Sequence, residues 1–195
     1  SPSAPASIAW TNWSINGQMG QPAPAAEFTW DPIVSNYELG LESYPLCAVG
    51  MTEGKIYADF DLKLVDVNPT GEEFLHFQVW NWDSQAWMTV KAYSNEDGDI
   101  PWTSEHLNIN TLAKGKVFRV RFHAMGENSL NILSWFVDNI RIYRTCAAPT
   151  DLTAEADYAG NGIRLNWVSP QGGGNIAEWI HWDDGVNDDA IGLTG

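Results

Sequence analysis

The stretch SWFVDNIRIY, residues 134–143, has the alternation that is typical of a β-strand. In steps of two, one face carries Phe136, Asp138, Ile140 and Ile142, and the other carries Trp135, Val137, Asn139, Arg141 and Tyr143. The first face is apolar except for one carboxylate, so we expect it to lie against the core. An ionised carboxylate among apolar neighbours is unfavourable unless it is hydrogen-bonded, paired with a cation or bound to a metal. Asp138 therefore needs a partner.

Similar alternation recurs through the preceding part of the chain, and turn residues separate the segments. We find no convincing window with the apolar spacing of a helix. The predicted strands lie at residues 55–67, 73–82, 86–93, 102–112, 117–124 and 134–143, with further strands before them. The pattern predicts an all-β fold, an antiparallel β-sandwich over residues 1–145.

The remaining residues, 146–195, form a second segment with its own strand signals. CAAPTDLTAEA (146–156) and GIRLNWVSP (162–170) each contain a candidate strand, and a Gly-Asn-Gly turn joins them. A complete immunoglobulin-like sandwich takes roughly 100 residues. The segment is therefore expected to be a truncated immunoglobulin-like domain or a partial module.

Composition limits the possible partners. The chain has 195 residues, 44% of them hydrophobic, and a formal net charge of −15. A strongly acidic surface repels phosphate backbones, so nucleic acid is disfavoured and Ca²⁺ is a better match. No apolar run approaches the roughly 18 residues of a membrane-spanning helix, so membrane insertion is not expected. The opening SPSAPAS is typical of a linker, and we expect the chain to be a piece of a longer protein.

The two cysteines, Cys47 and Cys146, match no zinc-binding spacing. They are compatible with one disulfide in an oxidising compartment. Two reduced, buried thiols are the alternative. The sequence does not decide between them.

Eleven tryptophans are far more than a chain of this length ordinarily carries. In EFLHFQVWNW (73–82), Leu75, Phe77 and Val79 are expected to face the core. The opposite face is then expected to carry His76, Gln78, Trp80 and Trp82, joined by Trp87, Thr89, Lys91 and Tyr93 from the next strand and by Arg119, Arg121 and His123 from VFRVRFHA (117–124).

Aromatic rings beside hydrogen-bonding groups suit a sugar, whose C–H face stacks on a ring while its hydroxyls find polar partners. The candidate ligand-binding residues are Trp80, Trp82, His76, Gln78, Arg119 and Arg121. Packing of the tryptophans under loops or against a neighbouring domain, and a protein-contact patch, are the alternatives. Trp87 is the tryptophan most expected to be structural.

Signatures of catalysis are missing from the sequence. The four histidines lie in no H-E-x-x-H motif, and neither G-x-S-x-G nor a phosphate-binding loop occurs. We therefore expect no enzymatic activity. The alternative is an autonomous hydrolase that uses a pair of the 25 acidic residues, as glycoside hydrolases do.

Several of these segments resemble one known family. Trp87 to Val90, Leu107 to Ile109, Gly115 and the strands 117–124 and 134–143 resemble MAM-like jelly-roll modules of the cleaved-adhesin, or choice-of-anchor, type found in Bacteroidota surface proteins. Their last strand has the form W-(F/Y)-(I/V)-D-(D/N)-(I/V)-x-(I/V)-Y, which residues 135–143 match at every position. The resemblance covers residues 55–145, and the Asp-rich opening segment common in these modules is absent. The tail resembles the start of a fibronectin type III domain.

The resemblance implies a secreted or cell-surface adhesion module that binds a glycan or a host or matrix protein, beside neighbouring domains of the same polypeptide. The alternative is a spacer or accessory domain of a secreted peptidase or glycoside hydrolase, with no ligand of its own. For Asp138 three roles stay open: an acceptor that holds a loop, a ligand of a structural Ca²⁺, or a solvated residue at the rim.

Overall fold

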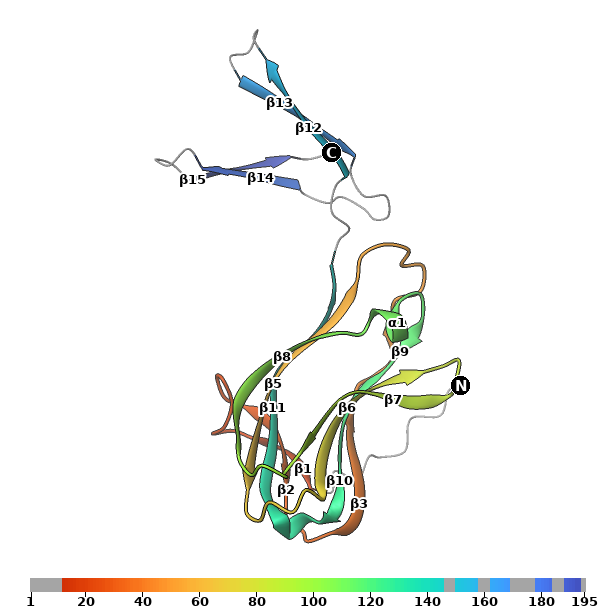
Figure 1. Ribbon diagram of the computed structural model, residues 1–195, viewed down its shortest axis with the longest axis vertical. Coiled ribbons are helices and arrows are strands. Elements are labelled where there is room, and N and C mark those ends of the chain that lie inside the picture. Colours follow the sequence, from red (N-terminus) through yellow and green to blue (C-terminus); the bar gives the residue numbers. More distant parts are fainter. Residues whose placement is uncertain (1–11, 146–149, 158–161, 169–177, 184–187, 194–195) are drawn as a thin grey trace. The chain divides into compact units, whose positions relative to one another are not determined.

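A computed structural model of the chain (Figure 1) describes residues 12–145, 150–157, 162–168, 178–183 and 188–193. The chain divides into two compact units, Ser1–Cys146 and Ala147–Gly195. Each unit is described by itself.

The first unit is an antiparallel sandwich of two sheets, as the alternation predicts (Figure 1). The five-stranded sheet has the order β1-β2-β11-β5-β8 and contains β1 (Trp13–Asn16), β2 (Ala25–Thr29), β5 (Ile56–Asp66), β8 (Ile100–Asn108) and β11 (Ile132–Arg144). The four-stranded sheet has the order β3-β10-β6-β7 and contains β3 (Ser35–Glu42), β6 (Glu73–Asn81), β7 (Ala86–Ser94) and β10 (Val120–Asn128). The all-β sandwich is confirmed.

Short elements connect these strands. β4 (Leu46–Cys47) pairs with β9 (Val117–Phe118), a 3-10 turn η1 spans Ser129–Asn131, and a one-turn helix α1 spans Asn110–Ala113. The helix takes the place of the last residues of the strand predicted at 102–112. Its Leu112 and Ala113 N–H groups donate to the Ile109 carbonyl.

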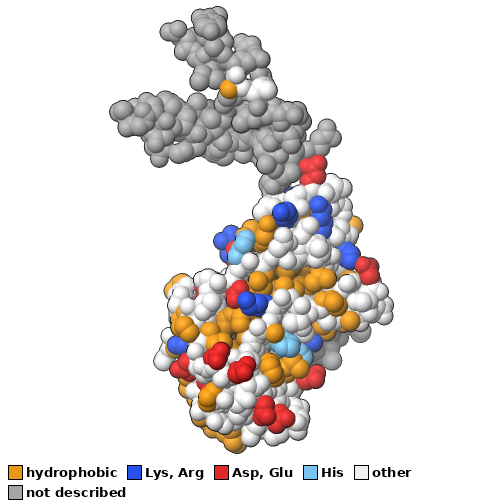
Figure 2. Space-filling model, in the orientation of Figure 1, with side chains coloured by type: hydrophobic (Ala, Val, Ile, Leu, Met, Phe, Trp, Pro, Cys, Tyr) orange, Lys and Arg blue, Asp and Glu red, His pale blue; other side chains and the backbone are white. Residues whose placement is uncertain are grey.

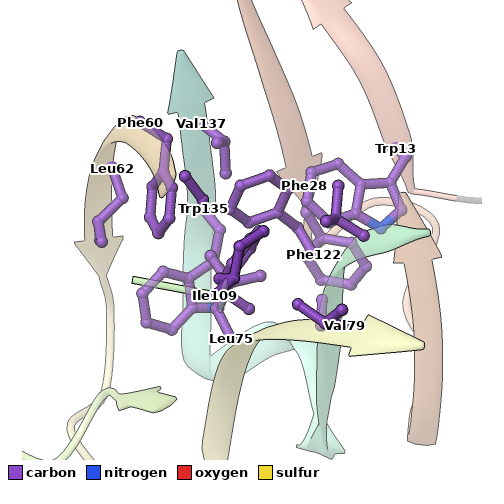
Figure 3. Packing of buried hydrophobic residues seen from close by; sticks show 14 of the residues in the cluster. Trp13, Phe28, Phe60, Leu62, Leu75, Val79, Ile109, Phe122, Trp135 and Val137 are labelled. Atoms are coloured by element: carbon purple, nitrogen blue, oxygen red, sulfur yellow. The ribbon is translucent and has the colours of Figure 1, made fainter. Parts of the chain in front are cut away.

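The core lies between the two sheets and is rich in aromatic rings (Figure 3). The inward residues of β5 and β6 are those that the alternation predicts, and Leu62, Leu75 and Phe77 are completely buried. The Phe60 ring centroid lies 5.1 Å from that of Phe77 and 4.9 Å from that of Phe122 in β10. Complete burial of a large apolar side chain stabilises the fold by about 1.5–3 kcal/mol. Because these residues fix which side of each strand faces the core, they also fix which residues lie on the outer faces of the sandwich.

The prediction for the faces of β11 is wrong. Trp135 and Val137 belong to the core cluster, whereas Phe136 contacts Trp102. Asp138 pairs with Asp61, a residue of the outward-facing set of β5, so Asp138 lies on the outer face and only partly buried. Trp135, Phe136 and Val137 are all buried, so hydrophobicity alone did not distinguish the faces. A bulge after Asp138, with Asn139 at φ +50°, then turns Ile142 toward the core.

A buried carboxylate holds one end of the four-stranded sheet. Glu73 is fully buried and accepts hydrogen bonds from the Tyr37 hydroxyl (2.6 Å), the Asn128 N–H (2.9 Å) and the Asn131 amide (2.9 Å). A Cβ at Gly126 would lie 1.8 Å from Glu73 Oε2, so only glycine fits there. The pKa of Tyr37 is raised by burial and by its bond to Glu73.

The second unit contains two antiparallel pairs. β12 (Thr150–Asp157) pairs with β13 (Gly162–Val168), and β14 (Glu178–Asp183) pairs with β15 (Asp188–Leu193). The fibronectin type III assignment of this unit stays a prediction. In the described parts of either unit, no helix has both the length and the apolar character that crossing a membrane requires.

Candidate functional site

Most of the predicted binding residues lie together on the outer face of the four-stranded sheet. In the pairing register, His123 of β10 stands opposite His76 of β6, Arg121 opposite Gln78, and Trp87 of β7 opposite Trp80. Residues paired across strands share a face, and their chain neighbours Leu75, Phe77 and Val79 are buried in the core. We call this surface the tryptophan face; it comprises Glu38, Glu42, His76, Gln78, Trp80, Trp82, Trp87, Thr89, Arg119, Arg121 and His123.

Three tryptophans form an edge-to-face cluster at one end of the tryptophan face. The Trp80 ring centroid lies 5.9 Å from that of Trp82 at an interplanar angle of 81°, and 5.4 Å from that of Trp87 at 71°. Trp80 and Trp87 are half-buried, whereas Trp82 is 47% exposed. Figure 2 shows hydrophobic side chains (orange) gathered in the region where Figure 1 places β6 and β7, with charged and histidine side chains among them.

Arginine side chains cover the ring of Trp87. The guanidinium carbon of Arg121 lies 4.3 Å from the Trp87 centroid and that of Arg119 lies 5.8 Å away, both within the range of a cation–π contact. The Trp87 ring is therefore partly covered within the protein, and its purely structural role stays a prediction. Within the cluster, Trp82 has the ring most available for stacking with a ligand.

A row of hydrogen bonds runs across three strands beside the tryptophans. The Arg121 Nε–H donates to Gln78 Oε1 at 2.6 Å, and the Gln78 amide donates to Thr89 Oγ1 at 2.8 Å. Glu42 of β3 accepts from Arg119 Nη2 at 2.5 Å and lies 3.6 Å from Arg121 Nη1. These contacts fix the positions of the side chains at the centre of the tryptophan face.

Two histidines continue the tryptophan face beyond Arg121. His123 is 6% exposed, with Nδ1 at 3.4 Å from Arg121 Nη2 and Nε2 at 4.0 Å from a Glu38 carboxylate oxygen. Burial, and then the positive charge of Arg121, lower the pKa of His123 to about 4. The same two causes lower the pKa of His76, so both imidazoles are neutral at pH 7.

Two residues of β7 leave the face that the sequence assigned to them. Lys91 and Tyr93 were expected beside Trp87 and Thr89, but the pairing of β7 with β6 slips by one residue between Thr89 and Lys91. Because a one-residue bulge reverses the alternation, Tyr93 packs against the core. Lys91 forms an ion pair with Glu105 of the other sheet at 3.6 Å.

Asp138 holds a loop through hydrogen bonds. Its Oδ2 accepts the Gln21 N–H at 2.6 Å and its Oδ1 accepts the Asn139 N–H at 2.7 Å. The Asn139 amide also donates to the Gln21 carbonyl, at 2.7 Å. These bonds give Asp138 the loop-holding role, one of the three predicted.

Calcium at Asp138 stays a prediction. Ca²⁺ takes six to eight oxygen ligands, and the described residues contain no group of three or more His, Cys, Asp or Glu side chains able to hold a metal. Both oxygens of Asp138 already accept N–H groups, so its surroundings fit a calcium site poorly.

The disulfide is likewise untested. Cys47 is exposed in β4, and Cys146 lies outside the described residues.

Glu42 could not be assigned to this site from the sequence. His123 was assigned to it only because it alternates with the apolar residues of its strand. Glu42 reaches Arg119 across 77 positions of the chain, because β3 pairs with β10. The sequence pointed to such a carboxylate only through the pair Arg119 and Arg121. Two neighbouring positive charges favour a nearby anion but do not indicate which residue supplies it.

Comparisons with known proteins give little beyond this geometry. No family model matches the chain, and no curated protein matches it. Two similar solved structures are a carbohydrate-binding module specific for non-crystalline cellulose (TM-score 0.44, 14% identity, 68% of this chain and 82% of that one) and a family 16 carbohydrate-binding module (TM-score 0.43, 12% identity, 68% and 86%). Likeness at this level carries no argument about what this chain binds.

Proposed function

We propose that the chain is a non-catalytic module that binds glycans on the tryptophan face, within a larger secreted or cell-surface protein. The observation that carries the proposal is Trp82. Trp82 is 47% exposed and lies edge to face on Trp80, whose strand also carries part of the hydrogen-bonded row of polar side chains. An exposed ring next to fixed polar groups is the combination that saccharide recognition needs.

In this proposal the C–H face of one sugar ring stacks on Trp82. The hydroxyl groups of the same or the following sugars exchange hydrogen bonds with Thr89 and His76, whereas Gln78 is buried and bonds to Arg121 and Thr89. Trp82 lies six positions after His76, a span of roughly 20 Å in extended chain. The tryptophan face is therefore long enough for a short oligosaccharide chain rather than a single sugar.

Intrinsic tryptophan fluorescence during titration with soluble polysaccharides tests the proposal. We expect a saturable change for at least one polysaccharide. Trp82→Ala should abolish it, because an alanine offers no ring to stack on. Trp102→Ala is the matched control, since Trp102 lies in β8 of the other sheet and contacts Phe136 there. Loss of binding in both variants would locate the effect in folding rather than in the tryptophan face.

Adhesion to a host or matrix protein is the main alternative, and a spacer role beside neighbouring domains of the same polypeptide is the other. Wild-type chain that responds to no polysaccharide would remove the glycan proposal. Surface attachment that persists in Trp80→Ala and Trp82→Ala variants would remove the tryptophan face as an adhesive site altogether.

A further inference from the structure

The charged groups of the tryptophan face neutralise one another. A single carboxylate, that of Glu42, holds both guanidiniums, with Arg119 on Oε2 and Arg121 on Oε1. Each guanidinium also donates its Nε–H within the protein, from Arg119 to the Ser43 carbonyl at 3.2 Å and from Arg121 to Gln78 at 2.6 Å.

The other ionisable groups add no positive charge. His76 and His123 are neutral at pH 7, since burial and Arg121 lower both pKa values. Glu38 lies beside His123 with its side chain 70% exposed. The two arginines and the two glutamates therefore balance, and the chain as a whole carries a charge of −15.

From this balance we infer that the ligand of the tryptophan face is an uncharged polysaccharide, not one that carries uronate or sulfate groups. The inference rests on the glycan-binding function proposed above. Both guanidiniums are already paired with Glu42, so an anionic group on the ligand would have to compete with that carboxylate for their charge. Long-range repulsion by the acidic chain adds to this discrimination. A neutral sugar requires only Trp82 and the uncharged partners Thr89 and His76, which lie with it on the tryptophan face.

Affinity gel electrophoresis with soluble polysaccharides tests the inference. Hydroxyethyl cellulose and galactomannan are the uncharged probes, and polygalacturonate and chondroitin sulfate are the anionic probes. We expect retardation by an uncharged probe alone. The Kd should stay constant as NaCl rises from about 0.05 M to about 0.5 M, because salt screens only charged contacts.

The outcomes separate the two proposals. Retardation by an anionic probe, lost at high salt, would overturn the inference of an uncharged ligand and leave glycan binding intact. Retardation by none of the four probes, together with no fluorescence response to any glycan, would overturn both.

A charge-removing variant gives a sharper test. Glu42→Gln frees both guanidiniums, so we expect the variant to gain at least several-fold in affinity for polygalacturonate, and this gain to disappear at high salt. Glu96→Gln is the matched control, because it removes the same charge from an exposed position between β7 and β8. Equal behaviour of the two variants would show that Glu42 does not exclude anions. Far-ultraviolet circular dichroism verifies that both are folded.

Discussion

Acid should destabilise this protein through His123. Its imidazole is almost completely buried and is surrounded by Arg121, Glu38 and His76. The pKa of the imidazole is about 4 in the folded chain and 6.5 where it is unperturbed. The unfolded chain therefore binds a proton near pH 6.5, whereas the folded chain binds it only near pH 4. The free energy of unfolding must fall as the pH is lowered through this window.

The size of the effect follows from the two pKa values. At about 1.4 kcal/mol per pH unit, the window between them corresponds to a loss of about 3 kcal/mol, complete near pH 4. This is a large part of the 5–15 kcal/mol that is typical of a domain's stability.

Urea denaturation of wild type and His123→Gln at a series of pH values measures the effect. Carboxylates that titrate in both proteins cancel in the difference between the two free energies of unfolding. We expect this difference to shift by about 3 kcal/mol in favour of the variant between pH 7 and pH 4. Parallel pH profiles would refute the reasoning. So would an imidazole resonance of His123 that titrates near pH 6.5 in the folded protein.

Four further outcomes are expected. Asp138→Ala should lower the free energy of unfolding by about 1–3 kcal/mol in urea denaturation, because two backbone N–H groups lose their acceptor; an unchanged value would remove the loop-holding role. If Asp138 also binds Ca²⁺, chelation should lower the melting temperature, since a ligand bound only by the native state stabilises it; an identical melt in EDTA would contradict calcium. Glu73→Ala should cost about 3 kcal/mol or more, since it leaves the buried Tyr37 hydroxyl and two partly buried N–H donors without their acceptor; a cost below about 1 kcal/mol would contradict this. A thiol assay without reductant should find no free thiol if Cys47 and Cys146 are paired, and two if they are not.

The sandwich could be predicted because its central strands alternate strictly. In β5 and β6 apolar residues recur at every second position, and these residues are buried; in β6, Glu73 and Gln78 are buried as well. The prediction for β11 was wrong because this strand is buried on both faces next to a bulge. Alternation cannot identify the core-facing side of the strand where three successive residues, Trp135, Phe136 and Val137, are all apolar. The bulge itself depends on Asn139 adopting a left-handed conformation. Asparagine tolerates this conformation, but its presence in a sequence does not predict it.

The tryptophan face was predictable to the extent that it follows from alternation within single strands. His76, Gln78 and Trp80 lie where the alternation of β6 puts them, Arg121 lies where that of β10 does, and Arg119 immediately precedes β10. Glu42 was not predictable, because its place depends on which strand pairs with β10. Thr89 was placed correctly while Lys91, two residues further on, was not, since the register slips between them.

Local contacts also orient the ring on which the proposed function depends. Trp80 meets Trp82 edge to face, and the chain just after Trp82 is held by the Asp83 N–H donating to Asn81 Oδ1 at 2.8 Å and by the Asp83–Lys116 ion pair at 2.5 Å. Arg121 and Gln78 are likewise fixed by their partners before any ligand arrives. Ordering a long side chain on binding costs about 0.5–1.5 kcal/mol, so a face whose side chains are already ordered loses little affinity to entropy. Such preorganisation would favour the binding of a sugar chain that is proposed for the tryptophan face.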